Sequence, residues 1–239
     1  PDLLDSWNFT IGMFFITFLG LLTAYIDKFM ATKFFTSEIF SYYALAFTIT
    51  KILGMFSDSV SAAVYPRLIE LSLNNNDDLK KFYHKSSQLI SVVAGSLASI
   101  LFIFSDEVVM VWTNNATLKA NIAPILAIIV VGELARTLSY IPNRLQIAHA
   151  WVGLNIKINI MISVLLIPII LYVSPIYGAI GMAFSWSFVN LMFLFIGVYL
   201  MHRRLLIKEF IYWLNFDILI PILSSFIVLW LPVDTRLLS

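Results

Sequence analysis

The run NFTIGMFFITFLGLLTAYI, residues 8–26, contains no charged side chain. A helix that rises about 1.5 Å per residue needs about 20 such residues to cross the roughly 30 Å hydrocarbon core of a bilayer. Apolar runs of similar length recur along the chain, which is 60% hydrophobic and 12% charged. Soluble domains average about 25% charged residues. The sequence therefore predicts an integral membrane protein.

Further apolar runs follow the first, and none of them shows the alternation of a β-strand. They are Ile39–Tyr65, Ser86–Phe104, Asn121–Ile141, Leu154–Val173, Tyr177–Met201 and Phe216–Leu231. Backbone that is exposed to lipid must satisfy its own hydrogen bonds, which leaves helices or a closed barrel. We therefore expect an all-α polytopic membrane protein with a bundle of about six to seven transmembrane helices.

The runs also suggest a division of the chain. Residues 1–201 are expected to form a six-helix transmembrane lobe, and residues 202–239 a cytoplasmic linker with a further short transmembrane helix. The chain opens on Pro1 without a starting Met and ends at Ser239 just after an apolar run. We therefore expect both ends to be cuts in a longer protein.

Prolines predict where two of the spans end. Because proline lacks an amide hydrogen and clashes with the preceding helical turn, Pro66 should end the second span and Pro142 the fourth. The polar stretch Arg67–Lys85 should then be a solvated loop, and Ser105–Ala120 a connection at headgroup level. Ser174–Ile176 should form a tight hairpin between the fifth and sixth spans.

The distribution of lysine and arginine predicts the orientation, because cytoplasmic loops carry an excess of both. If the first span exits away from the cytoplasm, eight of them fall on the cytoplasmic side and four on the other. The eight are Arg67, Lys80, Lys81, Lys85, Arg144, Arg203, Arg204 and Lys208, and the four are Lys28, Lys33, Lys119 and Arg236.

Lys51 lies inside the second span, where a charge is costly. Placing lysine at mid-membrane costs about 2.5 to 3.5 kcal/mol on insertion scales, so its side chain should face protein or water. Steps of three or four residues from Lys51 reach the small and polar residues Ala44, Thr48, Gly54, Asp58 and Ala62. A similar stripe on the first span, from Thr10 to Asp27, predicts that the two helices turn polar faces toward a shared interior.

Asp27, Lys51, Asp58, Glu133 and Arg136 are therefore the candidate cavity residues. Glu133 and Arg136 are three residues apart and can pair on one helix face. Arginine also offers a planar fork that suits phosphate, so Arg136 is a candidate ligand as well as a structural partner. The alternative for Lys51 is a structural lysine among closely packed helices, and Asp27 fits an interfacial anchor equally well.

Several function classes find no support in the sequence. A net charge of +1 gives no field for nucleic acid, so no nucleic-acid partner is expected. The absence of cysteine removes thiolate catalysis and Cys-ligated metals. The three histidines show no metal-binding spacing, and no nucleotide or nucleophile motif is present. We expect no catalytic residue, no metal and no cofactor.

Three short motifs carry a resemblance to a known family. They are FSYYALA at residues 40–46, AAVYPRL at 62–68 and YGAIGMA at 177–183, together with Asp27 at the end of the preceding helix. The sequence resembles the polysaccharide transporters, the O-antigen flippase group, within the superfamily that also holds multidrug antiporters and lipid II flippases. The resemblance covers residues 8–201 and matches the second half of a transporter built from two six-helix lobes.

The resemblance implies a function and partners. It implies movement of a polyprenyl-pyrophosphate-linked oligosaccharide across the cytoplasmic membrane of a bacterium by alternating access. Lys51 and Arg136 match the cationic lining of such a cavity, membrane lipid surrounds it, and the missing N-terminal lobe faces it. One alternative is a cation-coupled drug or metabolite antiporter that uses Asp27, Asp58 and Glu133, with H⁺ or Na⁺ as coupling ion. Another is a membrane-embedded glycan or phosphate transferase, and a third is a scaffold protein.

Overall fold

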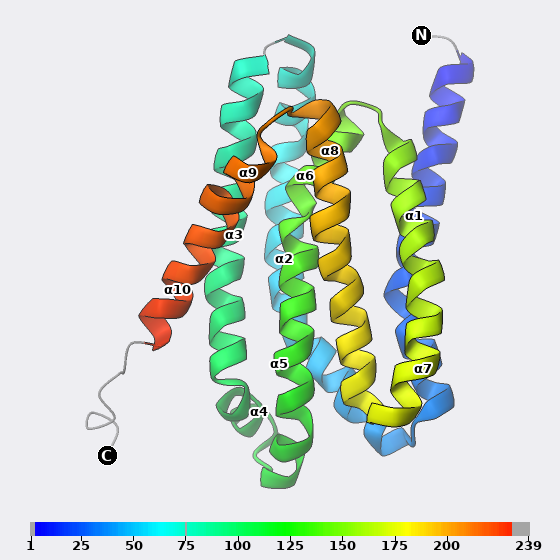
Figure 1. Ribbon diagram of the computed structural model, residues 1–239, viewed down its shortest axis with the longest axis vertical. Coiled ribbons are helices and arrows are strands. Elements are labelled where there is room, and N and C mark those ends of the chain that lie inside the picture. Colours follow the sequence, from blue (N-terminus) through cyan, green and yellow to red (C-terminus); the bar gives the residue numbers. More distant parts are fainter. Residues whose placement is uncertain (1–2, 75, 231–239) are drawn as a thin grey trace.

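The computed structural model describes residues 3–74 and 76–230, and these form helices without any strand (Figure 1). The elements are α1 (Leu3–Phe34), α2 (Ser37–Asn74), α3 (Asn76–Ile103), α4 (Ser105–Thr113), α5 (Ala116–Leu138), α6 (Tyr140–Ala148), α7 (Val152–Met192), η1 (Phe193–Gly197), α8 (Val198–Leu205), α9 (Phe210–Tyr212), η2 (Trp213–Leu219) and α10 (Ile220–Trp230). The η elements are π-helical turns within longer helices. The predicted all-α class is confirmed.

Five helices of the described part are long and apolar enough to cross a membrane. One of them, Gly153–Leu205, has 53 residues and would be about 80 Å long if it were straight. It reverses at Gly178, whose φ of 60° and ψ of −143° suit only glycine. Figure 1 shows the two resulting arms side by side. Together with α1, they complete a bundle of seven rods, as predicted.

The helix ends differ from those expected at the prolines. Helix α2 continues through Pro66 to Asn74, and α3 begins at Asn76, so the expected loop Arg67–Lys85 is wrong. Leu68 and Leu71 are buried beyond Pro66, and their packing offsets the hydrogen bond that the proline removes.

The other two predicted breaks are displaced by a few residues. Helix α5 ends at Leu138, and Pro142 lies in the first turn of α6, where a missing amide hydrogen costs little. Pro175 lies inside α7, so the hairpin expected at Ser174–Ile176 turns at Gly178 instead. The expected connection Ser105–Ala120 contains α4 and the start of α5, whose first turn is capped by the Asn115 side chain.

The outer face of the bundle is apolar. Large side chains such as Val164, Tyr172, Phe184 and Val228 are more than half exposed. Soluble proteins rarely show such continuous apolar surface, whereas lipid covers it at no cost. The chain is a multi-pass membrane protein. The predicted division at residue 201 stays a prediction. Helix α8 continues across this position, and α10 packs against α3.

Helix α5 lies at the centre of the bundle and contacts α2, α3 and α7. Gly132 of α5 lies close to the α7 backbone, and a Cβ added there would lie 2.6 Å from the Cα of Ser187. The Ser187 hydroxyl donates a hydrogen bond to the Ile128 carbonyl at 2.7 Å, which joins the two helices. Small residues at such crossings let the backbones pack closely.

Gly132→Ala should therefore destabilise the protein, because its methyl group must push α5 away from the α7 backbone. Overpacking of this kind costs about 1 to 3 kcal/mol. The thermal midpoint of the purified full-length protein in detergent measures the effect. Gly153→Ala is the control, because a Cβ at Gly153 meets nothing within 4 Å. Equal midpoints for the two variants would show that the crossing is looser than described.

The segments expected in the cytoplasm lie at one end of the bundle. The α2–α3 junction, the α6–α7 junction and the α8–α9 junction lie together at the top of Figure 1. The α1–α2 junction, α4 and the Gly178 reversal lie at the other end. The helix ends that carry the described lysines and arginines are thus grouped as the orientation requires, and Arg236 lies outside the described residues.

Single cysteines test which end is cytoplasmic. In a full-length background free of other cysteines, Lys81→Cys should resist an impermeant thiol reagent added to intact cells. Asn115→Cys should react with the same reagent, because the end of the bundle that holds residue 115 should face the outside of the cell. Both should react after permeabilisation, and the opposite pattern in intact cells would show that the topology is inverted.

Candidate functional site

A cavity of about 670 Å³, with several charged and polar side chains in its lining, lies between α1, α2, α5, α6, α7 and η1. It follows α2 from Ala44 to Asp58, a length of about 21 Å along the helix axis. Charged and polar side chains are costly at membrane depth and usually mark a pathway or binding site. This cavity is therefore the candidate functional site.

Lys51 enters the cavity from the middle of α2. It stands about 21 Å from the first residue of that helix, close to the depth that the sequence predicts. Its side chain is exposed, and among residues 3–74 and 76–230 no carboxylate lies within ion-pair distance of its ammonium group. The predicted neighbours Ala44, Thr48 and Asp58 line the same cavity. Lys51 is thus a positive charge available to a ligand.

Glu133 and Arg136 form the ion pair expected from their spacing. Arg136 donates through Nε to Glu133 Oε2 at 3.0 Å and through a terminal nitrogen to Oε1. The guanidinium also lies 5.2 Å from the centre of the Tyr140 ring. An added Cβ on Gly54 would lie 2.6 Å from Arg136 and 2.8 Å from Glu133, so this glycine makes room for the pair against α2. The fork of Arg136 is thus largely occupied.

Asp58 pairs across the cavity with Arg144 rather than with Lys51. The distance from Arg144 to the Asp58 carboxylate is 3.4 Å, and Arg144 Nε also donates to the Ser61 hydroxyl at 3.3 Å. Both charged side chains are partly exposed, at 30% for Arg144 and 66% for Asp58. This long and open pair can therefore exchange partners with a ligand at little cost.

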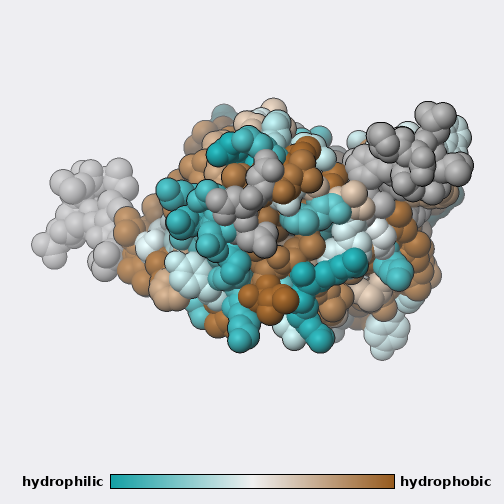
Figure 2. Space-filling view, turned by 90° about the horizontal axis from the view of Figure 1, so that it is seen from above, coloured by the Kyte–Doolittle hydropathy of each residue, from teal (hydrophilic) through white to brown (hydrophobic). Residues whose placement is uncertain are grey.

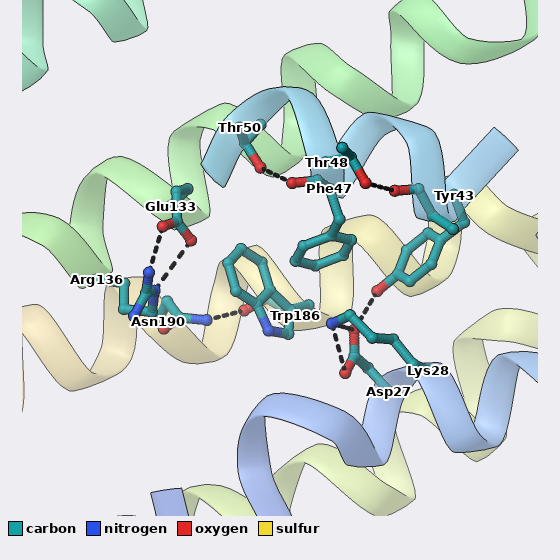
Figure 3. A network of polar contacts seen from close by, with 11 residues as sticks. Asp27, Lys28, Tyr43, Phe47, Thr48, Thr50, Glu133, Arg136, Trp186 and Asn190 are labelled. Carbon is teal, nitrogen blue, oxygen red and sulfur yellow. Dashed lines mark hydrogen bonds and ion pairs between the residues drawn. The ribbon is translucent and has the colours of Figure 1, made fainter. Parts of the chain in front are cut away.

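Asp27 lies behind the cavity wall and holds a second lysine. The Asp27 side chain is fully buried. It accepts a hydrogen bond from the Tyr43 hydroxyl at 2.8 Å and forms an ion pair with Lys28 at 3.2 Å. Lys28 lines the cavity, with its ammonium 3.9 Å from the centre of the Phe47 ring. Figure 3 shows this cluster and the Glu133–Arg136 pair on opposite sides of the aromatic residues Phe47 and Trp186.

Helix α1 also lines the cavity. Helix α1 packs mainly along α7 and has few contacts with α2. The α1 residues that reach the cavity are Leu21, Tyr25 and Lys28. Both helices thus face one cavity, but α1 reaches it from a position along α7, and Gly20 and Ala24 of the predicted stripe lie among side chains that the structure does not describe. That the stripe from Thr10 to Asp27 faces this interior stays a prediction.

Sequence reasoning did not assign a set of amides to the cavity that contains Lys51. Asn155 and Asn159 line the cavity from the start of α7, and Asn190 lines it from the second arm beside Trp186. Asn159 donates to Asn155 Oδ1 at 2.6 Å, and Asn190 donates to the Trp186 carbonyl at 2.9 Å. The spacing of Asn155 and Asn159 by four residues on an apolar helix was the available signal. Amides and aromatic rings can together bind hydroxyl-rich ligands.

The cavity carries more positive than negative charge. Its lining contains the cations Lys28, Lys51, Arg136 and Arg144, and the carboxylates Asp58 and Glu133. Even when the buried Asp27 is counted against Lys28, the formal balance stays at +1. The arrangement therefore favours an anionic ligand over a cationic one.

A helical membrane bundle with such a cavity is typical of a transporter. Comparisons with known proteins agree. The model of the family described as "Polysaccharide biosynthesis protein" matches residues 2–116, which include Asp27, Lys51 and Asp58. A protein of Shigella flexneri named "Putative O-antigen transporter" is 24% identical over 166 residues. That alignment covers 68% of this chain and 38% of the relative, so the chain spans well under half of its length. The resemblance to the polysaccharide transporters is confirmed.

Proposed function

We propose that the chain is one lobe of a flippase that moves a polyprenyl-pyrophosphate-linked oligosaccharide across the cytoplasmic membrane of a bacterium. The observation that carries the proposal is the ammonium group of Lys51, which forms no ion pair with any described residue and lies in a net cationic cavity. The match to a protein named as an O-antigen transporter supports transport rather than enzymatic catalysis.

Two sets of residues in the cavity lining suit the two polar parts of such a substrate. Lys51 and the Asp58–Arg144 pair offer positive charge to a diphosphate, since a charge removed from water must be paired. Asn155, Asn159 and Trp186 offer amide groups and an aromatic face to a sugar. The prenyl tail stays in lipid, and a facing lobe of the same protein closes the other side of the cavity.

Coupling to H⁺ or Na⁺ is a separate part of the proposal. The buried carboxylates Asp27 and Glu133 are each held by a cation, whereas Asp58 is 66% exposed. Asp58 is therefore the acidic residue that a coupling ion reaches most easily. The excess of cations in this lobe supports an anionic substrate, whereas an excess of carboxylates over cations in the missing lobe would favour the antiporter alternative.

Complementation tests the function. The full-length protein should restore surface polysaccharide in a bacterial strain that lacks its own flippase. Vesicles made from those cells should move a polyprenyl-pyrophosphate oligosaccharide to the opposite leaflet. Export of cationic drugs with no movement of the lipid-linked oligosaccharide would instead identify an antiporter and refute the proposal.

A further inference from the structure

We propose that the junction of α8 and α9 forms a separate binding site for the headgroup of an anionic phospholipid. A pocket of about 440 Å³ lies there, and no residue lines both this pocket and the central cavity. The site therefore does not depend on the proposed transport function.

Two cations give this pocket its charge. Arg203 and Lys208 line it with exposed side chains, and within the described part of the chain neither forms an ion pair. No carboxylate lines the pocket. The nearest acid in sequence, Glu209, pairs instead with Lys80 at 3.2 Å and lies 3.5 Å from His84. Positive charge is thus left available for an anion.

The backbone holds Lys208 in this position at some cost. Its φ of 71° is left-handed, a conformation that glycine or asparagine adopts more readily. The turn is closed by a hydrogen bond from the Glu209 amide to the Leu206 carbonyl at 3.1 Å. Such strain persists only where the surrounding structure fixes it.

Aromatic contacts form the wall of the pocket. The Tyr199 ring lies 6.0 Å from the Arg203 guanidinium and meets the Phe210 ring edge-on at 5.2 Å. His202 is buried and uses both ring nitrogens, because Nδ1 donates to the Val198 carbonyl and Nε2 accepts from the Tyr83 hydroxyl at 3.1 Å. His202 therefore supports the pocket wall, and the anion is bound by Arg203 and Lys208.

Apolar residues beside the cations identify the ligand as a lipid rather than a soluble phosphate. Ile207 and Ile211 also line the pocket and are 66% and 63% exposed. A phosphate bound by Arg203 and Lys208 would place the attached glycerol and acyl chains against these isoleucines. Basic pockets at the cytoplasmic side of transmembrane helices bind anionic headgroups in this way.

The position along the bundle agrees with this assignment. The α8–α9 junction lies at the end that holds the α2–α3 and α6–α7 junctions (Figure 1). Seen from that end, hydrophilic side chains gather with apolar ones between them (Figure 2). This is the end that the charge bias places in the cytoplasm, where the leaflet is negatively charged.

Photocrosslinking tests the site in the full-length protein. Phosphatidylglycerol with a diazirine in its acyl chain should crosslink to residues 199–211, as mapped by peptide mass spectrometry. The double variant Arg203→Ala/Lys208→Ala should lose these crosslinks by about tenfold or more, since each basic residue contributes about 1 kcal/mol. Arg203→Lys should keep them, because it retains the charge. Lys81→Ala, an exposed lysine at the same end, should change nothing.

Competition distinguishes the possible ligands. Unlabelled phosphatidylglycerol should suppress the crosslinks, whereas phosphatidylcholine and millimolar inorganic phosphate should not. Equal suppression by phosphatidylcholine would show an apolar groove without headgroup selectivity. Suppression by inorganic phosphate would show a site for a soluble anion. Either result, or full crosslinking of the correctly folded double variant, would overturn the proposal.

Discussion

Replacing Lys51 by alanine in the full-length protein is expected to abolish transport or reduce it severely, with normal amounts of protein in the membrane. Lys51 is the cation of the cavity lining that lies at mid-helix and has no ion pair within residues 3–74 and 76–230. Its removal therefore takes away ligand charge without leaving a buried partner charge behind. Restored surface polysaccharide in a flippase-deficient strain is the measurement.

Two further variants make the result specific. Lys51→Arg should keep part of the activity, because the charge remains while the hydrogen-bond geometry changes. Lys157→Ala should have full activity, because Lys157 is an exposed lysine of α7 that lies outside the cavity lining. Equal function of Lys51→Ala at matched expression would reject the ligand role. Loss of protein in both Lys51 variants would show that the lysine is needed for packing.

The membrane class and the number of helices could be predicted because they depend on local properties. A span needs only length and apolar composition, and both can be read directly from a run such as residues 8–26. Helix ends were less predictable. The helix continues beyond Pro66 because Leu68 and Leu71 are buried against other helices, and a local rule for proline does not include that packing.

The candidate site could be predicted in part. Lys51 could be found from its depth, and the Glu133–Arg136 pair from its spacing of three residues. The Asp58–Arg144 pair could not, because its members are 86 positions apart and meet only when α6 packs against α2. Nor could the contribution of Lys28, which depends on α1 lying along α7. Whether the predicted residues bind substrate stays a prediction.

The second large effect is expected on stability when Arg136 is replaced. Removing Arg136 from its ion pair should destabilise the protein more than removing the charge of Glu133. Arg136→Met leaves the Glu133 carboxylate, 5% exposed, without its cation, and breaking a buried pair in this way costs about 3 to 5 kcal/mol. Glu133→Gln leaves a guanidinium that is 41% exposed to the cavity and lies over the Tyr140 ring. That change should cost about 1 kcal/mol, because the remaining charge can still reach water. The thermal midpoint of the full-length protein in detergent measures both.

The double variant Glu133→Gln/Arg136→Met then separates structure from ligand binding. It should recover most of the stability lost in Arg136→Met, because no charge is left unpaired in the protein. If the stable double variant transports normally, the pair is structural and Lys51 acts without Arg136. If it is stable but inactive, Arg136 also contacts the substrate. Equal destabilisation by the two single variants would contradict the unequal burial from which the prediction follows.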